Sequence, residues 1–242
     1  MSASVIAEPI AEASPGRKAR IAGVFYLLTF LTGAPLIFVS GRLVVPGDAA
    51  ATATNILAHE PLFRLGFASN LVATACYIAV TALFYDLFKP VNRSVSLLAA
   101  FFSLVGCAVG AASSAFYLAP LVVLGGVQYL SVFQVEELQG LAFVFLKLHA
   151  QMYNIGLIFF GFYCLLIGYL IFRSAFLPRF LAVLMAFAGL GWLTFLSPPL
   201  ANYLSPYVLA PGIVGEGALT LWLLVKSVNV QRWNEQARKA RD

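Results

Sequence analysis

Charged residues are scarce in this sequence of 242 residues: Asp, Glu, Lys and Arg together make up 10%, against about 25% in an average soluble protein. Hydrophobic residues reach 61%, and the mean hydropathy is +0.90. This balance argues against a soluble globular domain. It indicates an integral membrane protein instead, because long apolar runs suit the interior of a bilayer.

Histidine and cysteine are also rare, which limits metal and redox chemistry. The two histidines are His59 and His149, and the three cysteines all fall inside apolar runs without a C-x-x-C pair. No H-E-x-x-H zinc motif and no G-x-S-x-G nucleophile elbow is present. The only set for a zinc site is His59, His149 and Glu216, whose spacing is not diagnostic. We therefore predict no metal, no cofactor and no catalytic residue, and an enzyme is the less favoured reading.

Six apolar segments are long enough to cross a membrane, which takes about 20 residues each. They cover residues 21–40, 62–88, 95–124, 143–172, 180–196 and 208–228. Such dense apolar runs must satisfy their backbone internally, so we expect helices. The polar segments after the first span and before the fourth are too short to cross, and we expect them at the outer interface. The sequence thus predicts an all-α integral membrane protein, a bundle of six transmembrane helices with two short outer interfacial helices.

The basic residues predict the orientation of this bundle. Twelve Lys and Arg fall on the side of both termini, whereas the other side holds Arg42 and Arg64, with Lys147 at a helix edge. The positive-inside rule then places both termini in the cytoplasm of a cell inner (plasma) membrane. We expect residues 1–20 to be a disordered cytoplasmic tail, residues 21–230 the membrane domain, and residues 231–242 a basic tail. Because the basic residues sit at helix ends, no nucleic-acid partner is expected.

Polar residues form stripes on two of the predicted helices. Asn70, Thr74, Tyr77 and Thr81 share one face of the second span, and Ser103, Cys107, Gly110, Ser114 and Tyr117 share a face of the third. Small and hydroxyl residues commonly let membrane helices approach and bond to each other. Packing is therefore the favoured reading of both stripes. Asn70 and Tyr77 are bulky for a tight seam, so a binding role stays open for the second span.

The stretch LKLHAQMYNIG, residues 146–156, is polar for a membrane helix. Gln151 and Asn154 share a face with Lys147, whereas His149, Tyr153 and Gly156 lie nearly opposite, so the two faces should meet different neighbours. We expect Lys147 to extend to the interface.

Glu216 is the only acidic residue well inside a predicted span, where an ionisable group costs about 2.5–3.5 kcal/mol on insertion scales. Three spans that enter from outside carry polar groups in their early turns. We predict that these groups converge in an outward-opening pocket, in which Arg64 or His149 pairs with Glu216. The candidate binding residues are Arg64, Asn70, Tyr77, His149, Tyr153, Asn154 and Glu216.

Several stretches resemble the bacterial membrane-protein family called domain of unknown function 4386. They are RIAG (20–23), GRLVVPGDAAATATNILAHE (41–60), FRLG (63–66), LKLH (146–149) and GYLIFRSAFLPR (168–179). Ala182 and Trp192 depart from the pattern, where Gly and Tyr are expected, and we interpret both as packing changes. The resemblance implies a bacterial multi-helix inner-membrane protein and no particular activity.

Three functions fit these observations. The first is binding or transport of a small amphiphile or ion through the polar pocket, which for six helices would call for a homodimer. The second is a structural or regulatory membrane subunit without a substrate, in which the polar residues lock the helices together. The third is an intramembrane enzyme acting on a lipid, with His149 and Glu216 as acid and base.

Overall fold

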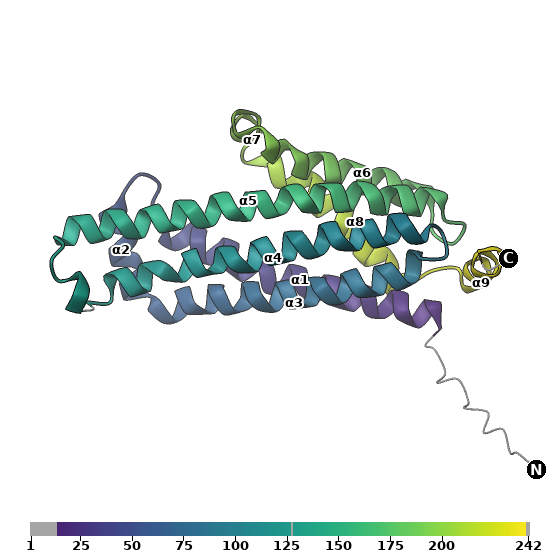
Figure 1. Ribbon diagram of the computed structural model, residues 1–242, viewed down its shortest axis with the longest axis horizontal. Helices are drawn as coiled ribbons and strands as arrows, with labels where there is room; N and C mark the ends of the chain where they lie inside the picture. Colours follow the sequence, from purple (N-terminus) through teal and green to yellow (C-terminus); the bar gives the residue numbers. More distant parts are fainter. Residues whose placement is uncertain (1–13, 127, 241–242) are drawn as a thin grey trace, which may run out of the picture.

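The computed structural model describes residues 14–126 and 128–240, and every regular element in this part of the chain is helical (Figure 1). The α-helices are α1 (Pro15–Leu43), α2 (Ala49–Ala58), α3 (Glu60–Phe88), α4 (Arg93–Leu124), α5 (Val135–Arg173), α6 (Arg179–Leu193), α7 (Pro198–Leu204), α8 (Ala210–Val225) and α9 (Val230–Lys239). Short 3₁₀ turns cover Gln128–Leu130, Thr194–Leu196 and Tyr207–Leu209.

Six of the helices are long and apolar enough to cross a membrane. They are α1, α3, α4, α5, α6 extended to Leu196, and α8 extended back to Tyr207. The prediction of an all-α integral membrane protein with six spans is confirmed.

Of the two short interfacial helices that the sequence predicts, one is present and one is not. The helix expected after the first span is α2, and its first turn is capped by Asp48, whose Oδ1 accepts a hydrogen bond from the backbone of Ala51 at 2.8 Å. The polar segment before the fourth span instead merges into α5, where Gln134 and Glu137 form a capping box at the first turn. The second short helix is α7, within the proline-rich connection between α6 and α8.

The long helices α1, α3, α4 and α5 run side by side, and α6 and α8 pack along α5 and α1 (Figure 1). Both described ends of the chain lie at one end of the bundle, which we call the basic end because the loops there carry most of the Lys and Arg residues. Here Asp86 bonds to Lys18 and Lys89, which ties α1 to α3.

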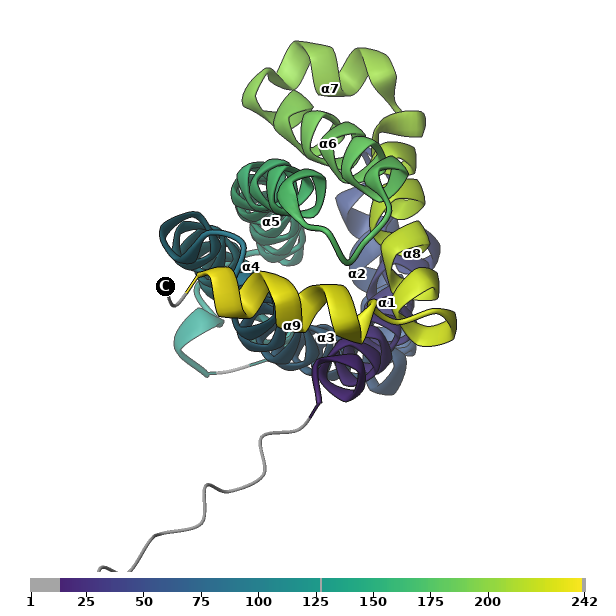
Figure 2. The same cartoon turned by 90° about the vertical axis from the view of Figure 1, so that its right-hand side faces the viewer.

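Helix α9 lies across the basic end (Figure 2). The Trp233 indole donates to the carbonyl of Leu87 at 2.9 Å, and Gln236 accepts a hydrogen bond from the backbone of Ala175 at 3.0 Å. The described part of the predicted basic tail is therefore a helix fastened to the bundle. The expected disordered tail likewise ends earlier, because α1 already begins at Pro15; residues 1–13 lie outside the described part.

Buried apolar side chains form two clusters at different depths. The larger cluster fills the half of the bundle nearer the basic end and includes Tyr26, Tyr77 and Trp192. The smaller one lies toward the opposite end, around Phe63 and Tyr117, whose rings stack at 4.2 Å between centroids. The polar groups inside the bundle divide between these two layers.

Candidate functional site

A buried carboxylate forms the centre of the larger cluster. Glu216 exposes 6% of its surface and accepts three hydrogen bonds. The hydroxyls of Tyr26 and Tyr77 donate to Oε2 at 2.6 and 3.0 Å, and the Trp192 indole donates to Oε1 at 2.7 Å. Donors from α1, α3 and α6 therefore meet a carboxylate on α8, so that one side chain connects four membrane helices.

The carboxylate lies at the middle of its apolar span, Tyr207–Val225. Glu216 precedes Lys226, at the basic end of α8, by ten residues. A helix rises 1.5 Å per residue, so the distance along the axis is about 15 Å, half of a hydrocarbon core of about 30 Å. This depth is where an ionised group is most costly.

Two glycines of α8 make the arrangement sterically feasible. A Cβ on Gly212 would lie 1.9 Å from the Trp192 ring, so the indole rests directly on the α8 backbone one turn before Glu216. A Cβ on Gly215 would lie 2.3 Å from the carbonyl oxygen of Leu184, so α6 and α8 touch at their backbones. The absence of side chains at these positions lets the Trp192 Nε1 reach Glu216.

The site contains no cationic partner for Glu216 among the described residues, whose ion pairs all lie elsewhere. It does contain further polar atoms. The Tyr26 and Tyr77 hydroxyl oxygens are 3.3 Å apart, and the Tyr163 ring lies 5.9 Å from the Tyr77 ring. The Tyr163 hydroxyl is buried without a hydrogen-bond partner. The centre is thus a single carboxylate surrounded by neutral groups, most of which can both donate and accept.

Arg64 does not belong to this site, and the predicted Arg64–Glu216 pair is wrong. The Arg64 guanidinium bonds to Glu60, four residues earlier on α3, at 2.7 Å, and both side chains are exposed. A neighbour one helical turn away is available without burying either charge. The local pair therefore prevails over a distant one inside the membrane.

His149 and Asn70 form a separate polar layer, and the predicted His149–Glu216 pair is also wrong. The His149 Nδ1 donates to the carbonyl of Ser113 at 3.0 Å, and the Asn70 amide donates to the Ser114 hydroxyl at 3.0 Å. Asn70 precedes Lys89 by 19 residues, which places it about 28 Å from the basic end. The candidate residues therefore do not converge in one pocket, because more than two helical turns separate Asn70 from Glu216.

Helix α5 presents its two polar faces to different neighbours, as its sequence predicts. Gly156 packs on the backbone of α4 at Gly106, on the same side as His149. Asn154 and Gln151 instead line a hollow between α5 and α7. Tyr153 packs against the larger cluster, and Lys147 is exposed with its Nζ 5.2 Å above the Phe143 ring.

Sequence reasoning identified Glu216 and Tyr77 but missed their partners. Tyr26 carries no polar neighbour in the sequence, and Trp192 was interpreted as a packing change, whereas its indole bonds to the carboxylate. Their role could have been found from a general property of these residues: a buried Tyr hydroxyl or Trp indole N–H usually has a hydrogen-bond partner. The packing reading fits the remaining stripes, because Thr81 and Ser103 bond to each other at 2.6 Å across α3 and α4.

The bond between Asn70 and Ser114 allows a measurement of what the outer layer contributes. Replacing Asn70 with alanine is expected to lower the free energy of unfolding by about 0.6 kcal/mol and at most about 1.7 kcal/mol, the range for hydrogen bonds between membrane helices. Unfolding of detergent-solubilised protein by SDS would measure it. Adding Ser114→Ala should cause little further loss, and two fully additive losses would contradict the bond.

Comparison with known proteins assigns the chain to a family. Residues 21–227 match the family described as Domain of unknown function (DUF4386). The chain belongs to this family. It is also similar to an Archaeoglobus fulgidus protein named "Uncharacterized protein", with 23% identity over 152 residues, which cover 62% of this chain and 75% of that protein. No solved structure matches.

Proposed function

We propose that this member of the DUF4386 family is a membrane carrier that binds an ion, namely a proton, at Glu216. The observation that carries the proposal is a carboxylate at mid-membrane depth that accepts from three ring donors and forms no ion pair with any described Lys, Arg or His residue. An ionisable residue in such a place marks a functional site by default. Binding a proton removes the charge that the bilayer disfavours.

The donors differ in a way that favours a proton on one oxygen. Trp192 can only donate, so Oε1 has to stay an acceptor. At Oε2 the partners are two tyrosine hydroxyls, which can also accept. A proton on Oε2 therefore finds an acceptor in Tyr26 or Tyr77 without leaving Oε1 unsatisfied. The carboxylate can change its charge while the four helices stay connected.

The orientation proposed for the carrier places the basic end in the cytoplasm of a cell inner membrane. The excess of Lys and Arg at that end supports it through the positive-inside rule. An enzymatic role has less support, because the acid–base pair expected for it, His149 with Glu216, does not form. His149, the residue expected in that role, bonds to Ser113 in the other polar layer.

Infrared difference spectroscopy during a pH titration tests the proposal. The native protein in nanodiscs is expected to lose the carbonyl band of a protonated, buried carboxyl group as the pH rises. Glu216→Gln should lack this band. Glu235→Gln serves as the matched control, because Glu235 is an exposed residue of α9, and it should keep the native band. The same samples in liposomes should show proton uptake for the native protein and for Glu235→Gln, but not for Glu216→Gln.

A structural role for Glu216 predicts a different set of results. If the carboxylate only locks the helices together, its band will not respond to pH anywhere in the range where the protein stays folded. Liposomes with native protein and with Glu216→Gln will then take up protons equally slowly. Either result would reject the proton-binding carrier.

A further inference from the structure

The hollow between α5 and α7 is distinct from the Glu216 centre. It has a volume of about 500 Å³, within the usual size range of ligand pockets. Residues of α5, of the segment after α6, of α7 and of the turn before α8 surround it. They are Gln151, Asn154, Ile155, Ile158, Phe195, Pro198, Ala201, Asn202, Ser205 and Val208.

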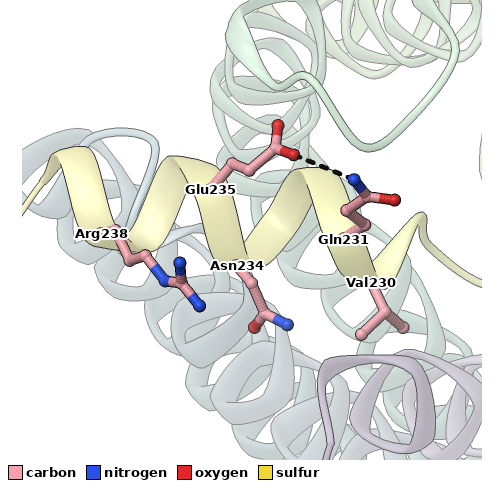
Figure 3. Close-up of a pocket in the computed structure, with 5 residues that line it drawn as sticks. All are labelled: Val230, Gln231, Asn234, Glu235 and Arg238. Atoms are coloured by element: carbon pink, nitrogen blue, oxygen red, sulfur yellow. Dashed lines mark hydrogen bonds between the residues drawn. The ribbon is translucent and has the colours of Figure 1, made fainter.

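Another hollow lies on α9 at the basic end and has a different character. It is lined by Val230, Gln231, Asn234, Glu235 and Arg238, all from α9, with Gln231 donating to Glu235 at 3.3 Å (Figure 3). A surface formed by one helix alone does not enclose a ligand. The hollow between α5 and α7 has walls from several elements, so the two sites are not equivalent.

The α5–α7 hollow lies at the membrane surface opposite the basic end. Gln151 precedes Arg173 by 22 residues, about 33 Å along α5, so it stands just beyond one hydrocarbon thickness. Next to it, Tyr203 and Tyr207 are 85% and 76% exposed. Exposed tyrosines mark the boundary between lipid and water. A ligand in this hollow would therefore contact both headgroups and acyl chains.

The lining combines uncharged polar groups with apolar ones. The side chains of Gln151, Asn154 and Asn202 carry carboxamides, and none of them bonds to another described residue. No charged residue lines the hollow, whereas Ile155 and Phe195 supply apolar contacts. Carboxamides both donate and accept hydrogen bonds, so they suit hydroxyl and ester groups. Neither a phosphate nor an ammonium group would find a counter-charge there.

From this lining we propose that the α5–α7 hollow binds the uncharged, hydroxyl-bearing head of a glycerolipid, of which a diacylglycerol is the simplest example. The head bonds to the carboxamides, and the acyl chains leave along the apolar wall toward lipid. The site does not depend on proton binding at Glu216. The two proposals can therefore fail separately.

Native mass spectrometry of detergent-solubilised protein with added dioleoylglycerol tests this site. The variant Asn154→Leu/Asn202→Leu keeps the approximate size of both side chains but removes their hydrogen bonding. Two lost hydrogen bonds at about 0.5–1.5 kcal/mol each should weaken the binding of dioleoylglycerol about tenfold. Asn234→Leu on the exposed face of α9 is the matched control and should bind as the native protein does.

Two further arms decide the outcome. Dioleoylphosphatidylglycerol, which carries a charged phosphate, should bind at least tenfold more weakly than dioleoylglycerol, and Glu216→Gln should bind dioleoylglycerol normally. Thermal unfolding checks that the double variant is folded; if it is not, Gln151→Leu alone replaces it. Equal binding of dioleoylglycerol by the native protein and the folded variant, or equal binding of both lipids, would overturn the proposal.

Discussion

Gly215→Ala is expected to destabilise the protein by about 3 kcal/mol, the upper end of the usual cost of overpacking. The added Cβ would lie 2.3 Å from the backbone oxygen of Leu184 and 2.8 Å from the Cβ of Ala188. A backbone atom cannot move aside as the end of a flexible side chain can. Relief therefore requires α8 to separate from α6, which also pulls Glu216 away from the Trp192 indole.

Gly217→Ala is the matched control for this experiment. It lies two residues further along the same helix, and a Cβ there meets nothing within 4 Å. Alanine favours a helix over glycine by up to about 1 kcal/mol, so this variant should be as stable as the native protein or slightly more stable. Thermal unfolding of both variants in the same detergent measures the difference. Similar melting temperatures would show that the contact between α6 and α8 is not tight.

The number and kind of helices could be predicted because each span is an apolar run bounded by charge or proline. The first residue of α5 could not be predicted, because residues 135–140 are polar enough to suggest a separate segment before the span. Their polarity reflects a helix that extends beyond the hydrocarbon core: its 39 residues measure about 58 Å, against about 30 Å for that core. Hydropathy locates where a helix enters lipid and not where it begins.

The candidate site was predictable only in part, because the sequence shows which face of a helix a residue occupies but not which residues of other helices lie at the same depth. Helical periodicity gives the face on which a residue lies, and this sufficed to separate Asn154 from His149 on α5. Periodicity gives neither the depth at which two helices align nor the nearest competing partner. Arg64 was misplaced because Glu60 lies one turn away, and Trp192 was missed because an aromatic residue in a span is usually packing.

The bond between Trp192 and Glu216 should be among the strongest hydrogen bonds in the bundle, because its acceptor is a buried carboxylate. Trp192→Phe removes the indole N–H that donates to Oε1 of this buried carboxylate at 2.7 Å. Hydrogen bonds to charged groups contribute about 1.5–3 kcal/mol, so we expect a loss of this size in the free energy of unfolding. SDS unfolding of detergent-solubilised protein would measure it.

A double-mutant cycle separates this bond from the loss of packing around the smaller ring. In a Glu216→Leu background, Trp192→Phe should cost at least 1.5 kcal/mol less, since the indole then has no carboxylate to bond and only its contact with Gly212 is lost. In a Glu216→Gln background part of the cost should return, because the uncharged Gln side-chain oxygen still accepts from the indole, in a weaker bond than a carboxylate makes. Equal costs in all three backgrounds would mean that Trp192 acts by packing alone. Costs that depend on the residue at position 216 would instead show that Oε1 is held as an acceptor by the indole. The proton would then bind and leave at Oε2, which lies between the two tyrosine hydroxyls.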